Sequence, residues 1–463
     1  MLTYDFEKID GPIYLYIYQC IKDDILSGVL KPGEKLPSKR SFANNNGIST
    51  ITIQNAYDQL ISEGYIYTRP KKGYYVARIE GLQRIPKQKD VHYDIEIPKK
   101  KEFRYDISSN GINSDNFPFS VWTKISRDVM SNRKEDLMEI SPTSGVLCLR
   151  QAIADHLKSF RGMLVDPDQI VVGAGTEYLY GVIIQLLGQK VYAIENPGYK
   201  KLTMIYGQRG IDCRYAVMDD DGVTVPGLEE TGADVAHICP NHHFPTGITM
   251  PASRRYEILA WAKAGEGRYI IEDDYDSEFR LEGKPIPTLF SIDGSEKVIY
   301  MNTFSKSLSP TIRISYMVLP VHLANLFYRE MSFYSCTVSN FEQYTLAQFI
   351  SQGYFEKHIN RMRLYYIRQR KRILKALKAS GLIEKCGIRE NGSGLHFLLK
   401  LDTSKSDQEV EAELEEEGIK IRALSDYYLT EGDNRQHYFI VNYSDLTEDD
   451  MEKVAGALFR VLQ

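Results

Sequence analysis

The sequence of 463 residues lacks any run of apolar residues near the roughly 20 that a membrane-spanning helix needs. The best stretch, 181–187, is far shorter, so we expect no membrane partner. Residues 1–10 carry acids and lack the basic start and apolar core of a secretory signal, so we do not expect export. The 6 cysteines lie far apart, without the spacing of a disulfide framework or a zinc site. These absences favour a cytoplasmic protein with reduced thiols and no metal.

The composition is that of a globular protein, with 43% hydrophobic and 26% charged residues, and the length favours two or three domains. A net charge of −5 argues by itself against a nucleic-acid partner. The charge is uneven, however, because residues 31–79 contain eight basic and three acidic residues, a local charge of +5. This segment is therefore suited to an anionic partner.

Residues 14–76 show a helical and then an extended pattern. Apolar spacing and turn residues predict three helices, with Ser38 as the N-cap of the second and the third starting at Ser49. Two tyrosine-rich runs, 65–67 and 74–76, predict strands joined by a basic turn. This order is typical of a winged helix-turn-helix, although periodicity alone is equally compatible with a small helical cap and a solvated basic hairpin.

In a winged helix the second helix of the helix-turn-helix lies in the major groove, and its early polar residues reach the base edges. The candidates for these contacts are Ser49, Thr50, Thr52 and Gln54.

Residues 11–78 resemble the DNA-binding domain of the GntR family of bacterial regulators. The strings that carry the resemblance are 12–14, 30–40, 49–52 and 63–66. The resemblance implies that Arg40, the start of the third helix, and Lys71 and Lys72 of the wing contact operator DNA.

Residues 80–103 are polar, contain prolines and a basic run, and lack a sustained period, which is typical of a linker. The lysines of such a run are more often solvated than bound to DNA. We therefore expect a DNA-binding domain at 11–79, a linker at 80–103 and a large domain at 104–463.

In the large domain, short β-rich runs alternate with helical segments, which predicts an α/β fold. The predicted strands are nearly all apolar, as expected for a sheet covered on both faces, and ligands of such sheets bind at the carboxyl ends of the strands. The runs are 170–172, 191–194, 236–239, 269–271 and 298–300.

The polar residues after these runs are the candidates for a site. A glycine-rich turn at 173–177 opens a helix and could bind a phosphate through its free amides, although such a motif alone is more often a structural turn. The acidic run 272–276 could be a metal site, a solvated tip, or a partner for a buried cation, and no histidine stands nearby at ligand spacing. Lys306, which follows the next strand, makes the third interpretation attractive, although an arbitrary lysine is usually a surface charge.

A lysine, a carboxylate and a phosphate-binding turn together suit an aldehyde cofactor that has a phosphate and a ring nitrogen. Lys306 would form the Schiff base, and Asp273 would keep the ring nitrogen protonated. Tyr275 would hydrogen-bond the ring hydroxyl, and Tyr199 would stack on the ring face. The phosphate would be bound by Gly175, Thr176, Ser305 and Arg313.

Residues 104–463 resemble fold-type I aminotransferases, and the whole architecture resembles the MocR subfamily of GntR regulators. The resemblance implies pyridoxal 5′-phosphate (PLP) as the cofactor and a homodimer. His242 and His243 look like a metal pair in isolation, but in this family they belong to a loop beside the cofactor, where His243 replaces the usual glutamine. The most specific strings are 240–247, 272–280 and 303–308 with Arg313.

One residue departs from the aminotransferase pattern. These enzymes commonly bind the substrate carboxylate with an arginine in a late strand, where this chain has Ile440. Arg422 could replace that arginine, and it could equally be an exposed arginine without a role.

These features favour a transcriptional regulator that uses PLP and senses an amine or amino acid effector. The alternative is an active aminotransferase with an appended DNA-binding domain, and a weaker one is a regulator that senses PLP itself or only dimerises its DNA-binding heads. Because the carboxylate anchor is missing, we expect no efficient turnover, whereas partial transamination is compatible with the sequence.

Overall fold

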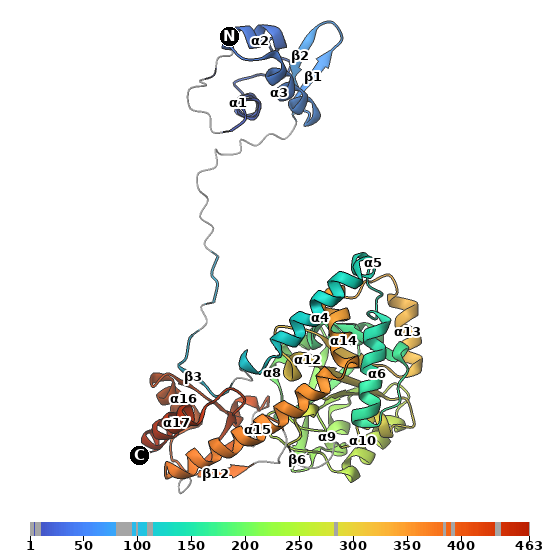
Figure 1. Ribbon diagram of the computed structural model, residues 1–463, viewed down its shortest axis with the longest axis vertical. Helices are drawn as coiled ribbons and strands as arrows, with labels where there is room; N and C mark the ends of the chain where they lie inside the picture. Colours follow the sequence, from blue (N-terminus) through green and yellow to red (C-terminus); the bar gives the residue numbers. More distant parts are fainter. Residues whose placement is uncertain are drawn as a thin grey trace. The chain divides into compact units, whose positions relative to one another are not determined.

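The computed structural model contains two compact units, Met1–Lys100 and Lys101–Gln463, each described by itself (Figure 1). The residues that the structure describes are 4, 11–79, 95–98, 101–108, 114–281, 286–382, 386–389, 394–430 and 437–462. Most of the expected linker, 80–103, lies outside them, so its boundaries stay predictions.

The first unit is a winged helix-turn-helix, as the sequence predicted. Ser38 and Ser49 cap α2 and α3 by accepting the backbone N–H groups of Ser41 and Thr52. Gly47 ends α2 in the left-handed region, at φ 67°. The elements of this unit are α1 (Ile13–Leu26), α2 (Lys39–Asn46), α3 (Thr50–Ser62) and the antiparallel strands β1 (Ile66–Arg69) and β2 (Gly73–Val76).

The second unit is built on an eight-stranded sheet in the order β4-β11-β10-β9-β8-β5-β6-β7. Neighbouring strands are parallel from β10 through β6, whereas β11 is antiparallel to both of its neighbours. The strands are β4 (Ile170–Gly173), β5 (Val191–Asn196), β6 (Asp212–Asp219), β7 (Gly222–Val223), β8 (Val235–Ile238), β9 (Tyr269–Asp273), β10 (Val298–Thr303) and β11 (Ser315–Val318).

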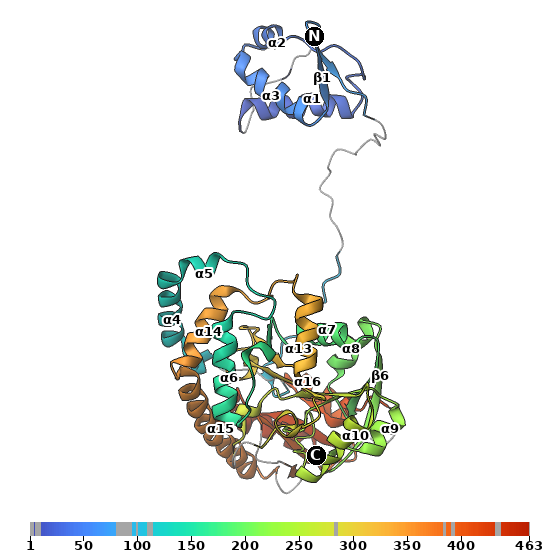
Figure 2. The ribbon, with the colours of Figure 1, turned by 90° about the vertical axis from the view of Figure 1, so that its right-hand side faces the viewer.

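Helices cover both faces of this sheet, which explains why every residue of β4, β8, β10 and β11 is buried. α6, α14 and α15 pack on one face, and α7 and α13 on the other (Figure 2). The helices of this layer are α6 (Leu147–Arg161), α7 (Thr176–Leu187), α8 (Lys200–Gln208), α9 (Val225–Thr231), α10 (Ala252–Ala264), α11 (Leu289–Ile292), α12 (Phe304–Ser307), α13 (Val321–Met331), α14 (Asn340–Ser351) and α15 (Tyr354–Ala379).

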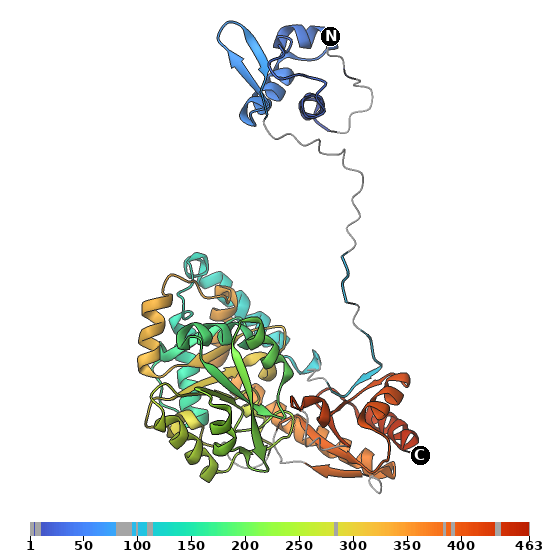
Figure 3. The ribbon, with the colours of Figure 1, turned by 180° about the vertical axis from the view of Figure 1, so that it is seen from behind.

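A smaller C-terminal lobe packs beside this layer (Figure 3). Its sheet has the order β12-β13-β16-β15, and a separate parallel pair joins β3 to β14. Its elements are β3 (Tyr105–Asp106), β12 (Cys386–Arg389), β13 (His396–Leu401), α16 (Asp407–Glu416), β14 (Ile419–Lys420), β15 (Arg422–Ala423), β16 (Tyr438–Asn442) and α17 (Glu448–Val461). The remaining helices are α4 (Phe119–Asn132), α5 (Lys134–Met138) and the 3-10 helices at Ser114–Asn116, Pro167–Gln169, Ser277–Phe279 and Leu424–Tyr427.

None of the helices in the described part of the chain has both the length and the apolar character that crossing a membrane requires.

Candidate functional site

A cavity of about 450 Å³ opens at the carboxyl ends of β5, β8, β9 and β10. The N-terminus of α7 and Tyr427 of the C-terminal lobe complete its walls. Seven of the eight predicted cofactor-binding residues line it: Thr176, Tyr199, Asp273, Tyr275, Ser305, Lys306 and Arg313. The eighth, Gly175, lies directly against the guanidinium of Arg313.

Asp273 ends β9 with one carboxylate oxygen unpaired. Its Oδ2 accepts a hydrogen bond from the Tyr180 hydroxyl at 2.7 Å and lies 3.4 Å from His237 Nε2. Its Oδ1 is buried and has no hydrogen-bond partner. Because an unpaired buried carboxylate oxygen is costly, this atom fits a cofactor that presents a protonated ring nitrogen to it.

Lys306 lies in α12, immediately after β10, and its side chain reaches the cavity. Loss of water around the ammonium lowers the pKa of Lys306 to about 8, although the charge of Asp276 opposes this shift. A larger fraction of the amine is therefore neutral near pH 7 than for a solvated lysine, which favours attack on a carbonyl carbon. The turn is held by Thr303, whose Oγ1 accepts hydrogen bonds from the Ser305 N–H at 3.1 Å and the Ser315 hydroxyl at 2.8 Å.

Gly175 and Arg313 form a cradle at the N-terminus of α7. Gly175 has φ 93°, a backbone conformation that favours glycine, and a Cβ built on it would lie 2.4 Å from Arg313 Nη2. Arg313 itself has a left-handed backbone, at φ 52°. The free amides and the positive end of the helix dipole join the guanidinium here, which makes this corner suited to a phosphate.

The aromatic side chains of the cavity meet a buried histidine cluster. Tyr199 packs edge-on against Phe244, with ring centroids 6.1 Å apart. The Tyr275 hydroxyl lies 3.3 Å from His242 Nδ1, which is also 2.8 Å from Asp276 Oδ2. Burial raises the pKa of Tyr275 well above its ordinary value, so its hydroxyl stays protonated and can donate a hydrogen bond.

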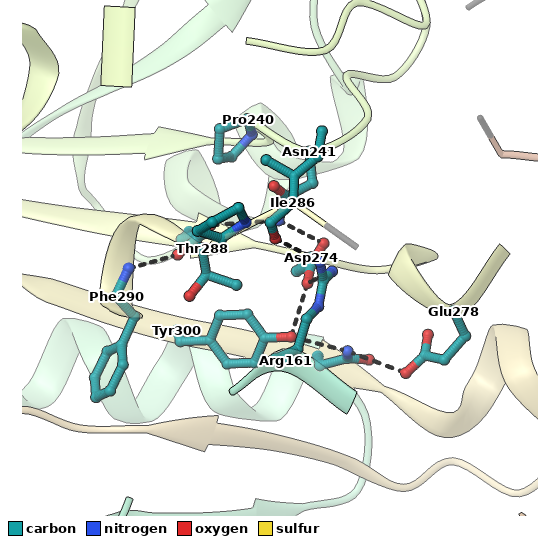
Figure 4. A network of polar contacts seen from close by, with 12 residues as sticks. Arg161, Pro240, Asn241, Asp274, Glu278, Ile286, Thr288, Phe290 and Tyr300 are labelled. Carbon is teal, nitrogen blue, oxygen red and sulfur yellow. Dashed lines mark hydrogen bonds and ion pairs between the residues drawn. The ribbon is translucent and has the colours of Figure 1, made fainter. Parts of the chain in front are cut away.

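The acidic run 272–276 divides its residues between two sides of the strand end. Asp273 faces the cavity, whereas Asp274 forms a buried ion pair of 2.5 Å with Arg161, as Figure 4 shows. Asp274 also accepts hydrogen bonds from Tyr300 at 2.7 Å and Asn241 at 2.8 Å. Among the described residues, no three His, Cys, Asp or Glu side chains lie together so that they could hold a metal ion. The interpretation of the acidic run as a metal site has no support from these residues.

Ile440 lies in β16, buried against Leu398 and Leu424, so the late strand has an apolar residue where aminotransferases commonly carry an arginine. Arg422 is the cross-strand partner of Ile440, but the structure does not bring it to the cavity. Its guanidinium pairs with Glu411 of α16 at 2.7 Å. The interpretation of Arg422 as an effector-binding cation therefore gains no support.

Sequence reasoning missed several polar residues of the cavity wall, among them Glu177, Glu195 and Lys201. Burial raises the pKa of Glu195 to about 8, and the Cys239 N–H donates to its Oε2 at 2.8 Å. Burial lowers the pKa of His243 to about 3, so this ring is neutral. The signal that could have identified Lys201 is its place in the first turn of the helix that follows Tyr199, as the second residue of that helix.

In the DNA-binding unit, the predicted contact residues lie at the start of α3 and in the wing turn. Ser49 is exposed, but its hydroxyl caps α3 and contacts Thr52 Oγ1 at 2.8 Å. Thr52 is half-buried. The remaining candidates are exposed: Arg40, Thr50, Gln54, Lys71 and Lys72.

Two family descriptions match the chain. Residues 13–76 match the bacterial regulatory proteins of the gntR family, and residues 106–458 match aminotransferase class I and II. The chain is 35% identical to the uncharacterized HTH-type transcriptional regulator YdeL of Bacillus subtilis, over 90% of each protein. It is 28% identical to the probable rhizopine catabolism regulatory protein MocR of Rhizobium meliloti, over 92% of this chain and 89% of that protein.

Solved structures with a similar fold include aminotransferases. The kynurenine aminotransferase of Pyrococcus horikoshii is 22% identical with a TM-score of 0.67, over 78% of this chain and 91% of that one. The multiple substrate aminotransferase of Thermococcus profundus is 21% identical with a TM-score of 0.69, over 79% and 92%. The chain therefore belongs to the MocR-type regulators of the gntR family, in which a winged helix is joined to a class I and II aminotransferase domain.

Proposed function

We propose that this transcriptional regulator holds PLP covalently on Lys306 and changes its affinity for operator DNA when an amine effector enters the same cavity. The observation that carries this proposal is the unpaired Oδ1 of Asp273, buried in the cavity that Lys306 and the glycine cradle share. These groups match the ring nitrogen, the aldehyde and the phosphate of one cofactor.

Each residue has a separate task. When bound, PLP supplies an electrophilic aldehyde carbon and an electron-withdrawing ring. Asp273 would hold the proton of the ring nitrogen, and Tyr275 would donate a hydrogen bond to the ring hydroxyl. Tyr199 would cover the ring face. The phosphate would be held by Gly175, Thr176, Ser305 and Arg313.

The surroundings of Ile440 favour sensing over efficient turnover. A bidentate arginine clamp gives charge-assisted hydrogen bonds to a carboxylate and orients the bond that reacts. Here the position is apolar, and Arg422 is engaged by Glu411. An amine would therefore bind without the orientation that fast proton transfer requires. Its binding would shift the population of the regulator between conformations that differ in affinity for operator DNA.

Operator DNA is the proposed partner of the winged helix, through the exposed residues Arg40, Gln54, Lys71 and Lys72. A homodimer is the proposed assembly, and an exposed apolar patch supports it. Asn340 donates hydrogen bonds to the carbonyls of Asp136 and Glu139 and so joins the two segments that carry the patch. The patch consists of Met138, Ile140, Phe333, Tyr334 and Phe341, exposed by 74%, 83%, 76%, 46% and 42%.

The decisive experiment is capture of the cofactor. PLP added to the purified chain should give a visible absorption band, and borohydride should then fix the cofactor on the peptide that contains Lys306. The Lys306→Ala variant should lose the fixed adduct and keep its circular dichroism spectrum, because the helix and strand contacts around the site do not involve the ammonium. Reduced cofactor on another lysine, or an unchanged adduct in Lys306→Ala, would contradict the assignment.

A further inference from the structure

The phosphate corner of the cavity contains an acid. Glu177 is the second residue of α7, and its side chain lines the cavity next to the cradle of Gly175 and Arg313. Its Oε1 accepts a hydrogen bond from Lys201 Nζ, and its Oε2 lies 3.5 Å from Arg313 Nη2. One carboxylate therefore bridges two of the cations that line the cavity.

This carboxylate is ionised at neutral pH. The hydrogen bond from Lys201, together with the charges of Lys201 and Arg313, holds the pKa of Glu177 below its usual range. The three side chains are 41%, 50% and 49% exposed, for Glu177, Lys201 and Arg313 respectively. Water and salt therefore screen the interaction only in part.

A phosphate bound in the cradle would compete with this carboxylate. The guanidinium of Arg313 packs against Gly175 and lies 3.5 Å from Glu177, so a phosphate in the cradle would meet this guanidinium beside the carboxylate. A phosphate monoester carries a charge of about −1.5 to −2 near pH 7, so a carboxylate beside its guanidinium partner repels it. The carboxylate of Glu177 also interacts with the positive end of the α7 dipole. Without Glu177, that end of the dipole would interact with the phosphate alone.

We propose that Glu177 weakens the hold of the cavity on the phosphate of its ligand, by sharing Arg313 and Lys201 with that phosphate. The cofactor then exchanges with the solution, and the occupied fraction of the regulator follows the concentration of the cofactor. This inference rests on the proposed PLP site and assigns one residue a role in its affinity.

The test compares two aldehydes that differ only in the phosphate. PLP and pyridoxal are titrated into the full-length chain and into Glu177→Gln, and the absorption band reports binding. Glu177→Gln should lower the dissociation constant of PLP roughly tenfold, which corresponds to about 1.4 kcal/mol. The dissociation constant of pyridoxal should change less than twofold. The gain for PLP should shrink as salt is added, because screening weakens the repulsion that the variant removes.

Two control variants separate charge from structure. Glu177→Asp keeps the carboxylate and should bind PLP within about threefold of the parent chain. Glu229→Gln removes another ion-paired glutamate, 50% exposed and paired with Arg268 at 2.9 Å, and it should bind PLP as the parent chain does. Neither variant should change the binding of pyridoxal.

Other outcomes would overturn the inference. If Glu177→Gln bound PLP no more tightly, Glu177 would only orient Lys201. An equal gain for PLP and pyridoxal would place its effect on the ring or the aldehyde. In both cases PLP binding by the parent chain would stand, and only the role of Glu177 would fall. A parent chain that gives no absorption band with PLP would overturn the proposed function as well.

Discussion

At the scale of single residues, the chemistry of the site depends on polar groups that are buried away from water. Lys306 and Asp273 line the same cavity, yet the lysine has a lowered pKa and the carboxylate keeps one unpaired oxygen. Burial is the common cause, because it removes water from the ammonium and leaves the carboxylate oxygen without a donor. Both effects prepare the site for a ligand that brings a carbonyl carbon and an N–H group.

The lowered pKa of Lys306 predicts a pH dependence. Only the neutral amine attacks an aldehyde, so the rate of PLP capture at a fixed low concentration should rise with pH. Because the pKa of Lys306 is lowered to about 8, the rise should level off above about pH 8. For a solvated lysine it would continue toward about pH 10.4.

Stopped-flow absorbance across pH 6 to 10 measures this profile, and free N-acetyl-lysine under the same conditions is the control for titration of the cofactor itself. A protein rate that rises through pH 10 as the control does would show that Lys306 is not desolvated.

At the scale of elements, a buried polar network joins α6 to the ends of β9 and β10. Arg161 of α6 donates to Asp274 and to the carbonyl of Ile286, and Tyr300 of β10 donates to the same carboxylate (Figure 4). The side chains of Arg161 and Asp274 are 3% and 1% exposed. The network therefore holds the strand end that carries Asp273 against the strand that leads to Lys306.

Arg161→Ala should lower the free energy of unfolding by about 3–5 kcal/mol, because it leaves the buried carboxylate of Asp274 without its cation. The matched control is Lys453→Ala, which removes an exposed i,i+4 pair with Asp449 and should leave the free energy of unfolding nearly unchanged. Urea denaturation of both variants, followed by circular dichroism, measures the difference. Equal stabilities would show that the buried pair contributes nothing beyond an exposed one.

At the scale of the whole molecule, the winged helix and the cavity lie in two separate compact units. Each unit has its own hydrophobic core, and the core of the first contains Ile17, Ile53 and Leu60. Under the proposed function, an effector response would have to pass from the unit that holds the cavity to the unit that holds the winged helix.

Removal of residues 1–100 should abolish operator binding and leave the dissociation constant of PLP within about twofold of the full chain. Fluorescence anisotropy with labelled operator and the PLP titration measure the two effects. For the full chain, operator affinity should fall steeply with salt, with a logarithmic slope of roughly −0.9 per phosphate contacted. Salt-dependent operator binding by the truncated chain would place the DNA-binding surface elsewhere.

The order of the elements follows from the sequence because it depends on local chemistry. Ser38 caps its helix as predicted, since a side-chain oxygen three residues from a free amide needs no distant partner. Apolar runs predicted the buried strands, and the motif strings predicted which residues line the cavity. The glycine at 175 was predicted in the same way, because the turn that opens α7 is local.

Only the tertiary structure decided which charged groups meet. Arg422 is separated by 11 residues from Glu411, which engages it, and Glu177 is separated by 136 residues from Arg313. Asp274 pairs with Arg161 across 113 residues. Such pairs form because the packing of strands and helices brings side chains together, and no local pattern encodes them. The sequence by itself therefore determined the elements and most of the proposed side chains that line the cavity, whereas the fold decided which charged groups pair with one another.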